Sequence, residues 1–428
     1  TASPDGEEVA FQAIGRIWIA PASGGEPRRL TGDGWFDGQE FAPTWSPDGR
    51  WIAFTTWDDL EGGRLWKVPV SGGTPQQLTP QPGEYVHPTW SPDGSELVLL
   101  RGAGATERGR TLTHNPWWDV VRVPAGDGQS TRVAQVSLPA GMNPSSVARR
   151  AVFSPSYGPD GRIFWPEFQE GSNGMETVLV SVRPDGMDRR EHMNLPHADE
   201  ATPSPDGRWV AFQEGDNVFL TPFPYAGTGE EPLDVNKRRG KLPIRTLTTK
   251  GGMFARWRDD STVEFGNATR YFAHDVNAET TDTVDINLTV PRDIPQGSMA
   301  FTGARIITLE EDQVLENATL VVEGSRIACV GDCQTDGVDR VVDAEGKTLI
   351  PGFVDMHSHH QREHRGYRPL RDYESAIYLA YGVTTGLDNS MWSAPGPTPP
   401  EIPSTDSATP PGRTISPASN RRKTTSFA

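Results

Sequence analysis

The chain has 428 residues, too many for one ordinary hydrophobic core, so we expect at least two domains. Its formal net charge of −17 argues against nucleic acid as the main partner, because binding to phosphates requires a basic surface. No apolar run approaches the roughly 20 residues that a membrane-spanning helix needs, so we expect no membrane span.

A four-residue turn motif recurs along the first two thirds of the chain. Ser-Pro-Asp-Gly appears four times and Gly-Pro-Asp-Gly once, at intervals of roughly 45 residues, and a degenerate copy follows. Proline presets φ for the first corner, aspartate bonds back to the backbone, and glycine takes the left-handed position. Short segments of alternating apolar and polar residues flank each copy. Each copy with its flanking segments therefore predicts about four antiparallel strands, the number in one propeller blade. The copies begin at Ser3, Ser46, Ser91, Gly158 and Ser204, and the degenerate one spans Trp257–Ser261.

These repeats resemble the TolB-like β-propeller family over about residues 1–290. The resemblance implies a mainly β protein whose first domain, residues 1–293, is a six-bladed propeller. The first copy lacks its leading strand, which we expect either before Thr1 or from a C-terminal segment. A propeller of this kind suits a module that binds a protein or peptide partner.

The third copy carries an insertion. Arg101–Arg110 is rich in glycine and charge, and His114, Trp117 and Trp118 follow it. Paired tryptophans beside a histidine are suited to line a pocket at the propeller mouth, whereas tryptophan pairs more often pack one blade against the next. Both interpretations stay open at this point.

Residues 294–350 read as short strands with glycine turns, which predicts a small β-sandwich domain. The chain's two cysteines, Cys329 and Cys333, lie in this segment. They have too few potential ligands around them for a zinc site. Two free thiols and a local disulfide in an oxidising compartment are the alternatives.

An apolar strand, Leu349–Met356, leads directly into His357 and His359. A strand alternates faces with period two, so Asp355 and both histidines should point the same way. Two imidazoles at the carboxyl end of a strand can hold one divalent metal, most commonly zinc.

The order of small sheet, apolar strand and His-x-His resembles the amidohydrolase superfamily, in particular its imidazolonepropionase-like branch. The resemblance implies a metal-dependent hydrolase of C–N bonds in small amides or peptides, with zinc held by His357 and His359. It also implies further ligands and a catalytic aspartate from later strands. Residues 351–393, with a helix over Asp372–Tyr381 and a strand from Val383, predict only the first βα unit of a TIM-like barrel.

The last segment, residues 394–428, is rich in Pro, Ser and Thr, and we expect a disordered tail of foreign or frameshifted origin. The later metal ligands are missing from it, so no catalytic residue is assigned and we expect the hydrolase to be inactive in this chain. The two functional hypotheses are therefore an amidohydrolase lineage and a peptide-binding propeller. We expect a periplasmic or secreted protein.

Overall fold

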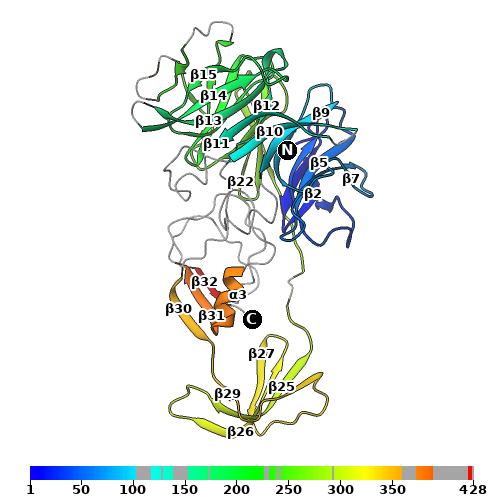
Figure 1. Cartoon of the computed structure of the whole chain (residues 1–428), viewed down its shortest axis with the longest axis vertical. Coiled ribbons are helices and arrows are strands. Elements are labelled where there is room, and N and C mark those ends of the chain that lie inside the picture. Colours follow the sequence, from blue (N-terminus) through cyan, green and yellow to red (C-terminus); the bar gives the residue numbers. More distant parts are fainter. Residues whose placement is uncertain are drawn as a thin grey trace. The chain divides into compact units, whose positions relative to one another are not determined.

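The structure is a computed structural model that divides into two compact units, residues 1–288 and the described residues from 289 onward. Both are built mainly of strands (Figure 1). No helix within the described residues is long and apolar enough to cross a membrane. The structure describes residues 1–102, 117–126, 129–137, 153–171, 174–225, 231–237, 240, 242–291, 294–358, 373–388 and 423–426.

The described part of the first unit contains six separate sheets, and none of them closes on itself. The first sheet has β1 (Glu8–Ala13), β2 (Arg16–Pro21) and β3 (Arg28–Arg29). The second has β4 (Gln39–Trp45), β5 (Trp51–Trp57), β6 (Arg64–Pro69) and β7 (Gln76–Gln77). The third has β8 (Glu84–Trp90), β9 (Glu96–Gly102), β10 (Trp117–Pro124) and β11 (Thr131–Ser137).

The other three sheets follow in chain order. The fourth has β12 (Ser156–Tyr157), β13 (Ile163–Gly171), β14 (Gly174–Val182), β15 (Arg190–Asn194) and β19 (Leu233–Asp234). The fifth has β16 (Ala198–Pro203), β17 (Trp209–Glu214), β18 (Asn217–Pro222) and β20 (Arg245–Thr246). The sixth has β21 (Met253–Trp257), β22 (Thr262–Asn267), β23 (Arg270–Asp275) and β24 (Thr280–Asp285).

The recurrent tetrapeptide forms the predicted turn between the first two strands of a sheet. In the second sheet, Ser46 Oγ donates to Asp48 Oδ1 at 2.6 Å and accepts the backbone N–H of Trp51 at 2.9 Å. Asp48 Oδ1 also accepts the N–H of Arg50 at 3.1 Å. Gly49 has φ +69°, the left-handed conformation that favours glycine. The copies at Ser3, Ser91 and Ser204 show the same serine–aspartate bond.

Tryptophans that precede these turns join neighbouring sheets. Each indole N–H donates to a backbone carbonyl on the inner edge of the sheet before it in the chain. The bonds run from Trp45 to Thr1 (3.1 Å), from Trp90 to Thr44 (3.2 Å) and from Trp257 to Thr202 (3.0 Å). In the fourth sheet Tyr157 takes the tryptophan position, and its hydroxyl donates to Glu96 of the third sheet at 2.8 Å.

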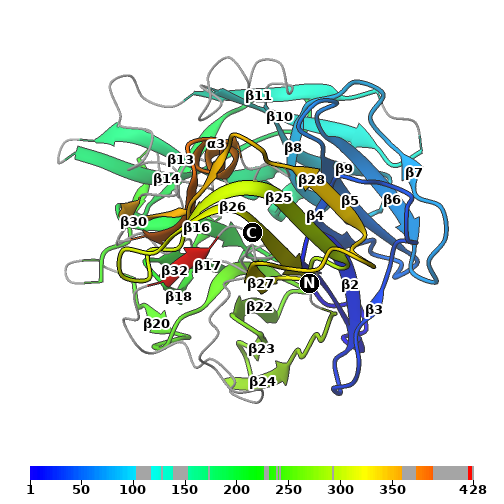
Figure 2. The same ribbon diagram turned by 90° about the horizontal axis from the view of Figure 1, so that it is seen from below.

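A hydrophobic cluster fills the space between each sheet and the next in the chain. The first sheet also packs against the sixth, through Ala2, Val9 and Tyr271. Ala2 N–H donates to Glu264 of the sixth sheet at 3.1 Å, and Ala2 bridges to Val9 where other sheets have their first strand. Figure 2 looks along the sheets and shows them in this order.

Residues 294–350 form one five-stranded sheet, not the two-layered sandwich that we predicted. Its core is small: one buried cluster of Ala304, Ile306, Ala318 and Ala344 offers too little apolar area to hold a second layer. Cys329 and Cys333 form a disulfide, which decides between the two alternatives for the thiols. The strands are β25 (Ser298–Ile307), β26 (Val314–Glu323), β27 (Arg326–Gly331), β28 (Arg340–Asp343) and β29 (Thr348–Leu349).

The remaining described residues form a strand, a helix and two more strands: β30 (Phe353–Ser358), α3 (Tyr373–Ala380), β31 (Val383–Asp388) and β32 (Lys423–Ser426). β30 and β31 are parallel, and β32 runs antiparallel to β31. The predicted helix is confirmed, and Gly382 ends it at φ +79°, with its N–H donating to Leu379 O at 2.9 Å. Apart from β32, the tail from residue 394 lies outside the described residues.

Replacing a turn glycine with alanine should destabilise the first unit. Gly49→Ala and Gly94→Ala should each cost about 1 kcal/mol, because a Cβ is unfavourable at these positive φ angles. Gly207→Ala should cost more, because its Cβ would lie only 2.5 Å from Pro159 Cγ. Chemical denaturation measures the differences, with exposed Gly32→Ala, whose Cβ meets nothing within 4 Å, as the control. Wild-type stability in all the turn variants would contradict the turn assignment.

Removing an indole N–H between sheets should also lower stability. Trp90→Phe leaves the carbonyl of Thr44 without this donor, and we expect a loss of about 1–2 kcal/mol including the lost contact area. Trp51→Phe is the matched control. It makes the same substitution at a ring that contacts Lys67, with Nζ 4.4 Å from the ring centroid, and leaves the Trp90–Thr44 bond intact. Equal free energies of unfolding for the two variants would contradict a role for the bond.

Candidate functional site

His357, the first member of the predicted metal pair, lies near the carboxyl end of β30. Its backbone N–H donates to Asp355 Oδ1 at 3.0 Å. The register of the parallel pair places Asp388 of β31 opposite Ser358, so an aspartate position adjoins the same strand end. His359 lies outside the described residues, and the pair of metal ligands therefore stays a prediction.

The described donors at this strand end do not by themselves make a metal centre. A catalytic zinc site normally takes three protein ligands and a water. Among the described residues, no group of three or more His, Cys, Asp or Glu side chains could hold an ion. Imidazole and carboxylate suit zinc by their chemistry, but Asp355 shares a strand with His357 and cannot enclose an ion. We derive no catalytic step through a metal from these residues.

The tryptophans of the predicted mouth pocket lie on β10. Trp118 is 1% exposed and packs in the core between the second, third and fourth sheets, with Trp57 and Trp165 among its neighbours. Trp117 is half-buried, and His114 lies outside the described residues. Trp118 thus serves packing, and the pocket that also needs His114 stays a prediction.

A pocket of about 400 Å³ opens elsewhere on the second and third sheets. Arg101 lies in its wall with its guanidinium already bonded: it donates to Asp119 Oδ2 at 2.9 Å and to Ser130 Oγ at 3.2 Å. The pocket therefore offers mainly amide and hydroxyl groups. Its lining comes from four chain segments, which explains why no sequence motif marked it: Gln77, Leu78, Pro80, Gln81, Tyr85, Arg101, Gln129 and Ser130.

Ionisable side chains gather on the first strands of several sheets, which we call the inner strands. His87 lies on β8, Glu200 on β16 and Arg256 on β21, and Glu264 of β22 pairs in register with Arg256. The Ser154 N–H donates to Glu200 Oε2 at 3.4 Å. We call these four residues, His87, Glu200, Arg256 and Glu264, the inner cluster.

Burial changes the charges within the inner cluster. Burial raises the pKa of Glu200 to about 8, although the Ser154 N–H and the charge of Arg256 oppose the rise. Burial lowers the pKa of His87 to about 3, and the charge of Arg256 adds to the effect. Near neutral pH Glu200 is therefore mostly a neutral acid and His87 a neutral imidazole.

The inner cluster spans the first unit from one side to the other. Arg256 belongs to the sixth sheet, and its charge acts on His87 of the third and on Glu200 of the fifth. Figure 2 shows β8 and β22 on opposite sides of the assembly of sheets. The charge of Arg256 thus acts on residues of two other sheets.

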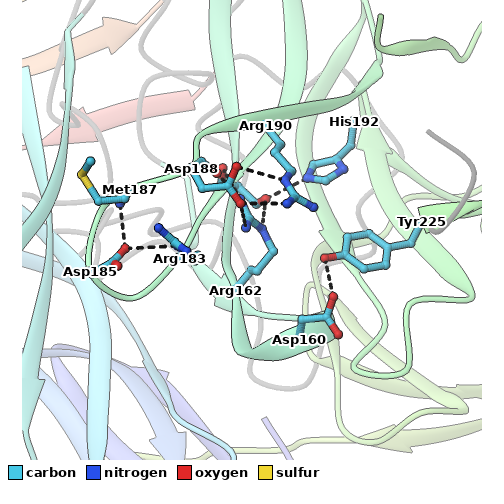
Figure 3. Close-up of polar contacts among 10 residues, drawn as sticks. Asp160, Arg162, Arg183, Asp185, Met187, Asp188, Arg190, His192 and Tyr225 are labelled. Carbon is cyan, nitrogen blue, oxygen red and sulfur yellow. Dashed lines mark hydrogen bonds and ion pairs between the residues drawn. The ribbon is translucent and has the colours of Figure 1, made fainter. Parts of the chain in front are cut away.

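A buried serine–histidine pair lies in the fourth sheet. Ser181 Oγ is 2.7 Å from His192 Nε2, and Arg162 Nε donates to the same Oγ at 2.8 Å. Because an arginine only donates, Ser181 donates its proton to His192, whose pKa burial lowers to about 4. Arg162 also binds Asp188 Oδ2 at 2.8 Å (Figure 3).

This pair resembles a nucleophile beside its base, but its environment excludes that chemistry. Ser181 is 0% and His192 1% exposed. The rings of Phe164, Phe223 and Tyr225 surround the imidazole with centroids 5.1, 5.6 and 5.7 Å away. With no path for a substrate, the network serves to hold β14 and β15 together.

No protein-family model matches the chain. Short stretches resemble curated enzymes. Imidazolonepropionase of Paenarthrobacter aurescens is 44% identical over 50 residues, covering 11% of this chain and 12% of the enzyme. Dihydroorotase of Wolbachia is 34% identical over 95 residues, 20% of each chain. The 5-methylthioadenosine/S-adenosylhomocysteine deaminase of Bacillus cytotoxicus is 45% identical over 64 residues, 14% of this chain and 15% of that one. The chain thus spans no more than a fifth of these relatives.

Solved structures that the chain resembles include two TolB proteins. TolB from Acinetobacter baumannii has a TM-score of 0.43 at 16% identity, covering 66% of this chain and 64% of that one. A TolB homologue from Agrobacterium tumefaciens has a TM-score of 0.37 at 18% identity, covering 66% of this chain and 78% of that one.

Glu200→Gln should change how stability depends on pH. The unfolded carboxyl loses its proton near its ordinary pKa of 4.5, whereas the folded one keeps it until about pH 8. The native state binds more protons between these values, so this residue's contribution to stability falls as pH rises through the window. Glutamine does not ionise, so the Tm of the variant minus the Tm of the wild type should increase from about pH 5 to about pH 9.

Thermal melts across that range measure the effect. Exposed Glu61→Gln is the control, because it removes a carboxylate without touching the inner cluster. A constant Tm difference between Glu200→Gln and the wild type at every pH would contradict the assigned protonation state.

Proposed function

We propose that the second unit is the first part of a metal-dependent amidohydrolase that cleaves C–N bonds in small amides or peptides. The short matches to imidazolonepropionase, dihydroorotase and a deaminase carry this proposal, because three enzymes of related chemistry resemble the chain at 34–45% identity. The matches cover little of each enzyme, so the activity, the substrate and zinc as the metal all belong to the proposal.

The arrangement of β30, α3 and β31 supports the lineage. A strand, a helix and a parallel strand make the repeating unit of a βα barrel. His357 stands near the carboxyl end of β30, the end at which barrel enzymes build their active sites. We therefore propose that these residues begin a barrel and that His357 and His359 begin its metal site.

We propose that the first unit is a six-bladed, TolB-like propeller. The six sheets in chain order, the hydrophobic cluster at every junction and the contact between the first sheet and the last support this architecture. In the lineage proposed here, the propeller would orient a substrate for the hydrolase.

A peptide-binding module is the second candidate function. The inner cluster and the 400 Å³ pocket favour it, because both bring polar groups from separate strands to one place in the first unit. We also propose a periplasmic or secreted location, which the disulfide between Cys329 and Cys333 supports, since disulfides persist in oxidising compartments.

Zinc binding tests the hydrolase lineage in this chain. We expect micromolar or weaker binding by calorimetry, because the described residues supply fewer ligands than a catalytic site takes. His357→Ala and His359→Ala should each abolish it, whereas exposed His197→Ala should not. Zinc affinity that is the same in all three variants would sink the assignment of the pair.

Hydrolysis assays complete the test. We expect no turnover of dipeptides or N-acyl amino acids above background, because nothing in the described residues activates a water molecule. Metal-dependent turnover that disappears in His359→Ala would show instead that the chain holds a complete site.

A further inference from the structure

One position on the inner strands differs sharply between the six copies. Five copies carry a hydroxyl side chain two residues before the tetrapeptide, and the sixth carries Arg256 at the equivalent position before Arg258–Ser261. In the second to fifth sheets the residue paired with this hydroxyl on the next strand is apolar, whereas in the sixth it is Glu264. The hydroxyl residues are Thr1, Thr44, Thr89, Ser156 and Thr202. The architecture therefore does not require an arginine here.

At least one of these hydroxyl side chains reaches the adjacent sheet. Thr202 Oγ1 donates to Ser156 Oγ of the adjacent sheet at 3.3 Å. Arg256 occupies the corresponding place on the next sheet, since β21 contacts β16. Its charge also acts on His87 of the third sheet. Arg256 is therefore near enough to His87 and Glu200 for its charge to act on both.

The guanidinium N–H groups of Arg256 are available as hydrogen-bond donors. A guanidinium carries five N–H groups, and within the described residues none of those of Arg256 makes a hydrogen bond or an ion pair shorter than 4 Å. Burial lowers its pKa, while Glu200 and Glu264 raise it. Glu264 meanwhile accepts the N–H of Ala2. A half-buried cation without a direct partner is unfavourable unless something else binds it.

The neighbouring groups also offer unused hydrogen-bonding capacity. His87 Nδ1 is buried and makes no hydrogen bond within the described residues. Glu200 accepts one backbone N–H through Oε2, and as a neutral acid it has a proton to donate. His87, Glu200 and Arg256 lie on the first strands of three different sheets, and the charge of Arg256 acts on both of the others.

We propose that the inner cluster binds a carboxylate, with the guanidinium of Arg256 gripping both oxygens and the side chains of His87 and Glu200 completing the site. The planar fork of arginine matches a carboxylate in two parallel hydrogen bonds. The site lies within the first unit and does not depend on the hydrolase lineage.

The charges favour a carboxylate over other ligands. A divalent cation would be repelled by Arg256. A doubly charged phosphate would meet one cation and the carboxylate of Glu264, in a chain whose net charge is −17. A singly charged carboxylate meets the same two groups but brings only half the negative charge next to Glu264. It can come from a small organic acid or from the C-terminal end of a peptide.

Calorimetry with the full chain tests the proposal with four probes: acetate, trialanine with a free carboxylate, trialanine amide and inorganic phosphate. Trialanine should bind at least about tenfold more tightly than its amide, and the carboxylates more tightly than phosphate. Tighter binding of trialanine than of acetate assigns the site to peptide ends, and equal binding assigns it to small acids. Either result supports a carboxylate site.

The double variant Arg256→Thr, Glu264→Gln gives the sixth sheet the hydroxyl of the other copies and keeps an acceptor for the Ala2 N–H, so it should fold. It should lose carboxylate binding by about tenfold or more. Arg258→Ser is the matched control: it removes one positive charge two residues away and restores the serine of the turn motif.

Arg256→Lys is a second variant, which keeps the charge and should weaken binding because an ammonium lacks the fork. Thermal melts confirm that each variant is folded. The proposal is overturned if the native chain binds no free carboxylate up to about 10 mM, if phosphate or the amide binds as tightly, or if Arg256→Lys and the double variant both bind like the wild type.

Discussion

The first unit depends on the junction between one sheet and the next. A tryptophan at the end of an inner strand reaches back to a carbonyl of the preceding sheet, as Trp90 does to Thr44 at 3.2 Å. The turn that follows also touches the preceding turn: a Cβ on Gly94 would lie 3.6 Å from Pro47 Cδ. One tetrapeptide with its tryptophan therefore both ends a strand and sets the spacing to the next sheet. A short sheet cannot bury both faces alone, so this repeated contact makes the hydrophobic clusters possible.

The copies that depart from the repeat use other chemistry. In the fourth sheet Tyr157 bonds to Glu96, and Arg162, Ser181 and His192 form a polar network inside the core. That network is closed off from solvent, with Ser181 and His192 almost fully buried, and so it excludes catalysis. The sixth sheet departs in the opposite way, because Arg256 keeps its donors unbound within the described residues and retains accessible surface. A polar group that is satisfied by its neighbours serves stability, and one that is left unsatisfied is available to a ligand.

The second unit exposes large apolar side chains on β30 and α3. Phe353, Val354 and Met356 of β30 are 56–60% exposed, although a barrel strand normally buries such side chains on both faces. Ile377 on α3 is also exposed, at 51%. β30 and α3 thus present an apolar surface that the other described residues do not cover.

The sequence by itself determined the local features: the turns with their left-handed glycines, the four-strand periodicity, and the helix that Gly382 ends. These follow from contacts within a few residues, which sequence spacing reports directly. It did not determine whether the cysteines bond, nor that residues 294–350 form one sheet, because both depend on how strands pair. It pointed to Trp118 and His357 by residue type. Trp118 lies in the core, and the metal pair of His357 and His359 stays a prediction because His359 lies outside the described residues. Only the tertiary structure brought His87, Glu200 and Arg256 toward one another from three sheets, because charges that are distant in the chain meet only where the sheets pack together.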